Sequence, residues 1–210
     1  MKTKIAILVL SMLAITTLLT NMAGCHKAEH APTCWDRAQF GDPAQSPYVL
    51  PYSVGKSYRV YQTYCGFQNH GRDNQLAYDF EMPFESPVLA AHAGTVVEVY
   101  DTHLDSDGYD QQFNYIYIRH DDGSAAFYAH LRQHSALVRE GDIVQVGQHI
   151  ANLGNLGSSI TTTDLLHFGV YRTWPNRQGD DLPVNFRNAD GPLDARGGLQ
   201  VDAFYLALPY

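Results

Sequence analysis

Three histidines and one aspartate stand out because each lies in or beside a stretch of aromatic and aliphatic residues. In "NHGRDNQLAYDFEMP", His70 precedes Asp79, while "FYAHL" carries His130 and "DLLHFGV" carries His167. An acid within an aromatic run costs several kcal/mol to bury unless it is paired or bound to a metal. One carboxylate and histidines from separate strands suit a catalytic zinc site, which uses three protein ligands and leaves one position for water. The alternative for each histidine alone is a structural core residue.

The strands that would position these side chains are visible as alternating patterns. Successive side chains of a strand point to opposite faces of a sheet. In "LLHFG", His167 therefore shares a face with Leu165. In "LAYDFEM", Asp79 shares a face with Glu81, and Tyr78 points the other way.

The rest of the chain has the features of a turn-rich β protein. Its 210 residues include 17 Gly, 10 Pro and 14 Tyr, which favours strands and turns over helices. Asp122-Gly123, between two alternating runs, is a typical hairpin turn. Strand-like patterns cover residues 56–62, 86–100, 113–131, 142–154 and 165–172, and "VDAFYLALPY" at the C-terminus is expected to add an edge strand. We predict an all-β fold, mainly of antiparallel sheets, with few or no helices.

The N-terminus has the organisation of an export signal. Lys2 and Lys4 precede an apolar run, and the small residues Ala23 and Gly24 precede Cys25. This end resembles a bacterial lipoprotein box, which implies cleavage before Cys25 and lipidation of its thiol. The acyl chains would anchor the protein to a membrane. The alternative is a single membrane-spanning anchor, because the apolar run is nearly long enough to cross a bilayer.

Charge and cysteine content narrow the class of protein further. The net charge of −8 and the absence of a clustered Lys/Arg surface argue against a nucleic-acid binder. Cys34 and Cys65 fit an exported protein with one disulfide. Two unpaired buried thiols are the alternative.

Four segments together resemble the lysostaphin-type (LytM-like) zinc metallopeptidases, which cut peptide cross-links in bacterial peptidoglycan. They are "HGRDNQLAYDFEMPFESPVLAAHAGTVVEVY", "NYIYIRHDDGSAAFYAHL", "VREGDIVQVGQHIANLGNLGSS" and "LLHFGVYR". They occur in the family's order within residues 67–172, about half of the chain. The resemblance implies the family's antiparallel β fold, the lysostaphin-type or duplicated hybrid motif fold, with a metal at the floor of a groove.

Carried over residue by residue, the resemblance implies that His70, Asp79 and His167 hold one Zn²⁺. His130 is then a catalytic residue that orients or polarises the attacking water and the developing oxyanion. The first histidine of the family's H-x-H motif aligns with Leu165. That histidine has an acid/base role, which typically contributes ~10²- to 10⁴-fold, and leucine cannot replace it.

The expected organisation is a signal peptide (1–24), a tether and extended lead-in (25–56), a metallopeptidase domain (57–172) and a loop-rich C-terminal tail packed on it (173–210). The first hypothesis is an exported zinc peptidase acting on peptidoglycan peptide stems, weakened by Leu165. A second is a non-catalytic module of the same fold that binds peptidoglycan or a partner cell-wall hydrolase, and a third is a structural lipoprotein. We expect an outer-membrane lipoprotein facing the periplasm, because His26, after the lipidated cysteine, is not the aspartate associated with inner-membrane retention.

Overall fold

Eleven strands and two short helical segments form the regular structure of the described residues. The computed structural model describes residues 33–66, 75–104, 113–154, 164–177 and 179–210. The strands are β1 (Ser57–Gln62), β2 (Tyr78–Glu81), β3 (Pro87–Leu89), β4 (Gly94–Tyr100), β5 (Asn114–Arg119), β6 (Ala125–Leu131), β7 (Ile143–Val144), β8 (His149–Asn152), β9 (Leu165–Tyr171), β10 (Ala189–Asp190) and β11 (Phe204–Ala207). The helical segments are α1 (Cys34–Arg37) and η1 (Pro43–Gln45). The predicted export signal, Cys25 and His70 lie outside the described residues.

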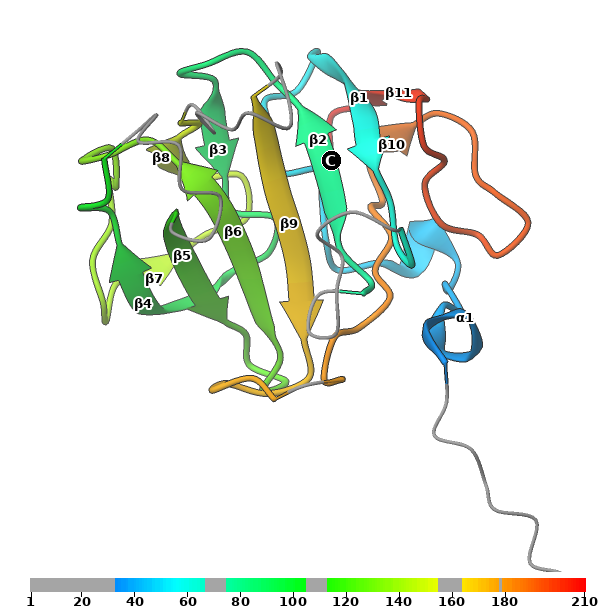
Figure 1. The fold of residues 1–210 in the computed structure, drawn as a ribbon, viewed down its shortest axis with the longest axis horizontal. Coiled ribbons are helices and arrows are strands. Elements are labelled where there is room, and N and C mark those ends of the chain that lie inside the picture. The colour runs from blue at the N-terminus through cyan, green and yellow to red at the C-terminus, as the bar shows by residue number, and fades with distance from the viewer. Residues whose placement is uncertain (1–32, 67–74, 105–112, 155–163, 178) are drawn as a thin grey trace, which may run out of the picture. The chain divides into compact units, whose positions relative to one another are not determined.

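Nine of these strands form one antiparallel sheet. Its order is β10-β11-β1-β2-β9-β6-β5-β4-β7, and β3 pairs with β8 in a separate two-stranded sheet. Figure 1 shows β2 and β9 side by side near the middle of the large sheet. The prediction of an all-β, mainly antiparallel fold is confirmed. Of the helices described, none combines the length and apolar character needed to cross a membrane.

Local sequence signals account for the hairpin and for part of the C-terminal pairing. β5 and β6 form the predicted hairpin, and Gly123 adopts φ 88° in its turn, a conformation that glycine adopts without strain. The predicted C-terminal strand is β11, but it is second from the edge rather than at the edge. The reason is that Ala189 and Asp190 pair with the side of β11 that faces away from β1.

Alternate residues of the central strands point to two different environments. Leu166, Phe168 and Val170 of β9 belong to the main hydrophobic core, as do Ala126 and Tyr128 of β6. The intervening residues of these strands lie on the opposite side, where Phe127, Ala129, Tyr117 and Tyr171 form a second, smaller cluster. We call the side that packs on the main core the core face and the opposite side the outer face. Strand alternation therefore separates packing residues from those available to a site.

The core face is covered by the β3–β8 sheet and by the extended lead-in before β1. Tyr48, Leu50 and Tyr52 are buried in the main core. The Val49 N–H donates to the Ala91 carbonyl at 2.8 Å, and the Leu89 N–H donates to the Pro51 carbonyl at 3.0 Å. The last residues of the lead-in are therefore fixed to the domain by backbone hydrogen bonds as well as by burial.

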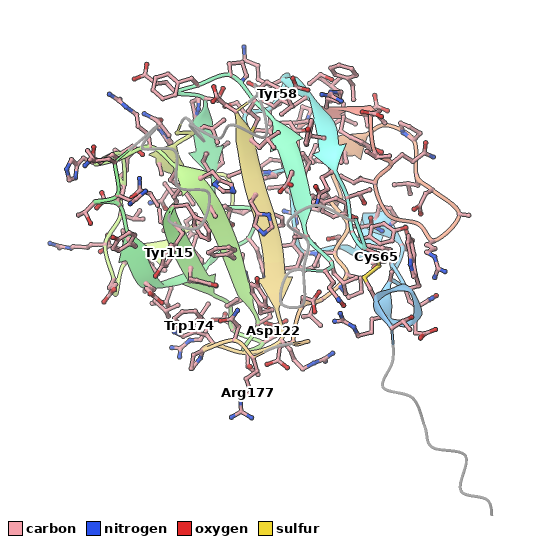
Figure 2. All side chains as sticks on the ribbon, viewed as in Figure 1. Tyr58, Cys65, Tyr115, Asp122, Trp174 and Arg177 are labelled. Atoms are coloured by element: carbon pink, nitrogen blue, oxygen red, sulfur yellow. A yellow bond between two sulfur atoms is a disulfide. The ribbon has the colours of Figure 1, made fainter. Side chains whose placement is uncertain are left out.

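A disulfide joins α1 to the segment after β1. Cys34 and Cys65 are bonded, with Cα atoms 5.7 Å apart and 31 residues of sequence separation. Figure 2 shows Cys65 beside α1, at the edge of the domain. The Arg37 side chain adds an ion pair with buried Asp181. These contacts fix the start of the described chain to the domain.

Buried His120 and half-buried His92 form a cluster that the sequence does not link to the candidate zinc site. The rings of His92 and His120 lie 4.6 Å apart, and Tyr48 contacts both. The Nδ1–H of His120 donates to the Ala93 carbonyl at 2.8 Å. Its buried Nε2 has no hydrogen-bond partner among the described residues. Burial lowers the pKa of both histidines below the usual 6.5, and Asp122 partly opposes this.

This cluster predicts that stability falls in mild acid. Because the folded-state pKa values are lowered, the unfolded chain binds more protons as the pH drops below about 6.5. The free energy of unfolding should therefore decrease from about pH 7.5 to about pH 5, and His120→Gln should make this decrease smaller. The slope of the free energy of unfolding against pH should differ between wild type and His120→Gln by on the order of 1 kcal/mol per pH unit at most. Urea unfolding at several pH values measures it.

His134→Asn is the matched control, because His134 is exposed and asparagine tolerates its φ of 55°. An unchanged pH dependence in His120→Gln, or an equal change in the control, would contradict this assignment.

Candidate functional site

Asp79 and His167 form the centre of the candidate site. They are directly opposite each other in the β2–β9 pairing, and each is only 6% exposed. Nδ1 of His167 lies 2.8 Å from Oδ1 of Asp79. An ionised carboxylate only accepts, so the imidazole donates this hydrogen bond. The two predicted ligands are therefore already adjacent on the outer face.

His130 reaches the same face through a β-bulge. Asn114 pairs with Leu131 but Tyr115 pairs with Ala129, which leaves His130 as the extra residue. Its φ of 66° is unusual for a residue other than glycine. The result is that its ring centroid lies 6.2 Å from that of His167. Regular alternation would instead place His130 on the core face with Tyr128.

The strained backbone at His130 is held by Gly154, which follows β8. The Gly154 N–H donates to the His130 carbonyl at 2.9 Å. A Cβ on Gly154 would lie 2.6 Å from the Leu131 carbonyl oxygen, so only glycine allows this approach. A left-handed conformation in a residue of this type costs of order 1–3 kcal/mol and persists where its surroundings fix it.

An aromatic cluster closes one side of the site. Its members are Phe113, Tyr115, Tyr117, Phe127, Tyr171 and Trp174. Phe127 lies 5.8 Å from the His167 ring, and Phe113 lies 5.1 Å from the His130 ring. Burial and, to a smaller extent, the nearby His167 lower the pKa of His130 to about 4, and Asp79 partly opposes this shift. The His130 imidazole is therefore neutral at pH 7, so it can both accept and donate a proton.

Leu165 and an ion-pair network lie on the other side. Leu165 is 5% exposed and stands opposite Glu81 in the β2–β9 pairing. The Glu81 carboxylate accepts from Arg59, which also binds Asp202 at 2.5 Å. Tyr128 offers no replacement for the missing histidine, because it is buried on the core face, where its hydroxyl accepts from the Ala91 N–H. The described residues thus provide a single histidine, His130, beside the two predicted ligands.

The donor atoms of Asp79 and His167 fit a zinc ion. Structural and catalytic zinc sites use carboxylate oxygens and imidazole nitrogens at about 2.0–2.2 Å. Two such donors on a tetrahedral ion lie ~3.3 Å apart, close to the 2.8 Å observed here. No group of three His, Cys, Asp or Glu residues suitable for a metal is found within the described ranges. The predicted third ligand, His70, is not among the described residues.

Two functional features were missed from the sequence. The bulge at His130 has no sequence motif of its own. A glycine such as Gly154, farther along the chain, can mark a place where two backbones approach closely. The Arg59–Glu81 pair joins residues far apart in the chain, and only the pairing of β1 with β2 brings them together. Of the other described histidines, His134 and His149 are exposed, and His120 is buried and bonded to the Ala93 carbonyl.

Comparison with known families gives one match. Residues 73–183 match Peptidase family M23. This range contains Asp79, His130, Leu165 and His167. No curated protein sequence matches the chain.

Several solved structures are similar to this one. A zinc containing peptidase from Vibrio cholerae is 28% identical, with 60% of this chain and 37% of that chain covered and a TM-score of 0.43. The catalytic domain of the prophage-encoded M23 protein EnpA from Enterococcus faecalis is 21% identical, with 60% and 90% covered and a TM-score of 0.45. The catalytic domain of lysostaphin from Staphylococcus simulans is 26% identical, with 55% and 79% covered and a TM-score of 0.37.

The contact at Gly154 predicts that a single methyl group displaces His130. Gly154→Ala should lower the free energy of unfolding by about 1–3 kcal/mol, as overpacking does. It should also shift the ring proton resonances of His130. Urea unfolding and NMR of the full chain measure these two effects.

Gly41→Ala is the matched control, because a Cβ there meets nothing within 4 Å. A Gly154→Ala protein with unchanged His130 resonances would show that this glycine does not hold the bulge.

Proposed function

Because this chain belongs to Peptidase family M23, we propose that it is an exported zinc metalloendopeptidase that cleaves peptide cross-links of bacterial peptidoglycan. The observation that carries the proposal is the pairing of Asp79 with His167 on the outer face, with the His130 ring beside them. Nothing about packing requires a buried carboxylate, two histidines and a strained bulge at one place. A peptidase site explains all of them.

In this proposal His70, Asp79 and His167 hold the zinc ion. Bound zinc would act as a Lewis acid on the peptide carbonyl and would activate a water molecule for attack. The hydrogen bond between Asp79 and His167 orients the imidazole before metal binding. If Nδ1 were the ligand atom, the neutral imidazole would carry its proton on Nε2, so the ring would bind the metal as the other tautomer.

His130 is the proton carrier of the proposed reaction. Its neutral ring can accept a proton from the attacking water and return one to the leaving amine. The aromatic cluster excludes water from one side of the ring, which keeps the imidazole neutral and fixes its position. The Leu165 side chain cannot hold a proton. We therefore propose a slow enzyme, with one acid/base group in place of two.

Leu165 also supports a second candidate function. An apolar, buried side chain at this position is compatible with a domain that binds peptidoglycan, or a partner hydrolase, without cleaving it. Both candidates share the zinc site and differ only in turnover.

We further propose that the chain is a lipoprotein anchored through Cys25, with the domain in the periplasm. The charged and apolar pattern of residues 1–24 supports export, and the Cys34–Cys65 disulfide fits an oxidising compartment. The predicted tether and lead-in, residues 25–56, would link the anchor to the domain.

Metal titration of single variants tests the proposed ligand set. The full chain in detergent should bind one zinc ion. Affinity should fall by more than about 100-fold in Asp79→Ala, His167→Ala and His70→Ala, since changes beyond the ligands already cost about 10- to 100-fold. His130→Gln should retain zinc within about tenfold.

The same proteins test the reaction. The wild type should release amino groups from purified peptidoglycan between about pH 5 and about pH 9, and a chelator should stop the release. Zinc binding without chelator-sensitive cleavage would remove the enzyme and favour the binding module. A chain without zinc, or a His130→Gln variant that loses zinc as strongly as Asp79→Ala, would contradict the ligand assignment.

A further inference from the structure

A pocket of about 420 Å³ lies beside the proposed zinc site, at one end of the large sheet. It lies where β1, β9 and β11 begin and β2 ends. Figure 2 shows Tyr58, one of its residues, at this end of the sheet, far from Trp174 at the opposite end. The lining residues are Ser57, Tyr58, Arg59, Glu81, Met82, Pro83, Asp164 and Phe204. The volume is within the range of about 300–1,000 Å³ that is typical of small-molecule pockets.

Glu81 connects the pocket to the site. It is two residues beyond Asp79 on β2 and points to the same outer face, so the two Cα atoms lie about 7 Å apart along the strand. An extended peptide advances about 3.3 Å per residue. A substrate peptide held at Asp79 and His167 would therefore place a residue near the cleaved bond over this pocket.

Half of the pocket comes from outside the region that matches the family. Arg59 of β1 and Phe204 of β11 lie beyond residues 73–183. These two strands pair with each other and place Arg59 opposite Phe204. The pocket is thus a property of this chain's additional strands and does not follow from the family match.

The charges around the pocket favour a cation. Glu81 and Asp164 line it, and Asp202 pairs with Arg59 just beside it. Among the described residues that line the pocket, Arg59 is the cationic side chain, and both Glu81 and Asp202 accept from its guanidinium. These two carboxylates exceed the single positive charge of Arg59, which leaves a negative potential here that agrees in sign with the net charge of −8.

The remaining walls are apolar. Met82 and Tyr58 form the inner part, and Pro83 and Phe204 lie at the exposed rim. Phe204 is 62% exposed, so its ring is available to a ligand. Apolar walls and carboxylates together suit a side chain with a hydrocarbon stem and a cationic end, which can bury its stem while its charged end is paired.

We propose that this pocket binds a substrate residue that carries a primary ammonium group on an aliphatic stem. The stem packs against the exposed ring of Phe204, and the ammonium group donates to the Glu81 carboxylate. The proposal rests on the proposed peptidase function, because the substrate chain enters the pocket from the zinc site. The proposed substrates are therefore peptides that carry a free amine on a residue next to the cleaved bond.

Two blocked alanine pentapeptides provide the test, one with lysine at its centre and one with norleucine, which has the same stem without the ammonium group. Binding to the full chain is measured by titration calorimetry at low salt, with a chelator present so that no cleavage occurs. Cleavage of the same two peptides is then compared with zinc present. We expect the lysine peptide to bind about three- to tenfold more tightly, as for one net hydrogen bond in a pocket open to water. Glu81→Gln should abolish this preference, and Phe204→Ala should weaken binding of both peptides.

Glu140→Gln is the control, because it removes one exposed carboxylate elsewhere and should keep the preference. Equal binding of the two peptides, or an unchanged preference in Glu81→Gln, overturns the pocket assignment even if both peptides are cleaved. Conversely, a Glu81-dependent preference without any cleavage supports the pocket and contradicts the peptidase function. The two failures are therefore distinguishable.

Discussion

The β2–β9 pairing is the constraint on which the site depends, because it sets Asp79 directly opposite His167. Side chains alternate along a strand, so a slip of one residue would turn one of the two toward the main core. The register is fixed by Tyr78, Phe80, Leu166 and Phe168, which are fully buried on the core face. Burial of these four side chains thus holds a carboxylate and an imidazole 2.8 Å apart on the outer face. The fold's stability and the site's geometry come from the same pairing.

The two sides of the site differ in character. Toward β5, the aromatic cluster provides an apolar wall that lowers the pKa of His130 and excludes water. Toward β1, Arg59, Glu81 and Asp202 form a charged and more exposed wall. Leu165 lies between the Asp79–His167 pair and this charged wall. The apolar side suits control of a proton, and the charged side suits recognition of a substrate.

Alternation in the sequence was sufficient to predict most of the strands and the faces that Asp79 shares with Glu81 and His167 with Leu165, because these depend on local pattern. The expectation that Asp79 and His167 meet came from the family resemblance, since their pairing joins distant parts of the chain. The orientation of His130 was not predictable in this way, since a bulge with positive φ reverses the regular alternation. The pocket was also hidden, because β1, β2 and β11 bring Arg59, Glu81 and Phe204 together from distant parts of the chain. The C-terminal strand β11 was predicted at the edge of the sheet, but β10 lies beyond it. The pairing of β10 with β11 has no local sequence signal.

We propose that the zinc site is intact and that Leu165 limits its turnover. The rate of peptidoglycan cleavage by Leu165→His relative to Leu165→Gln, which has a polar side chain that cannot titrate, tests this proposal. We expect Leu165→His to raise kcat/KM by about 10²-fold or more over both Leu165→Gln and the wild type, and a chelator to abolish the gain. A Leu165→His protein that binds zinc but cleaves no faster than Leu165→Gln would contradict the proposal.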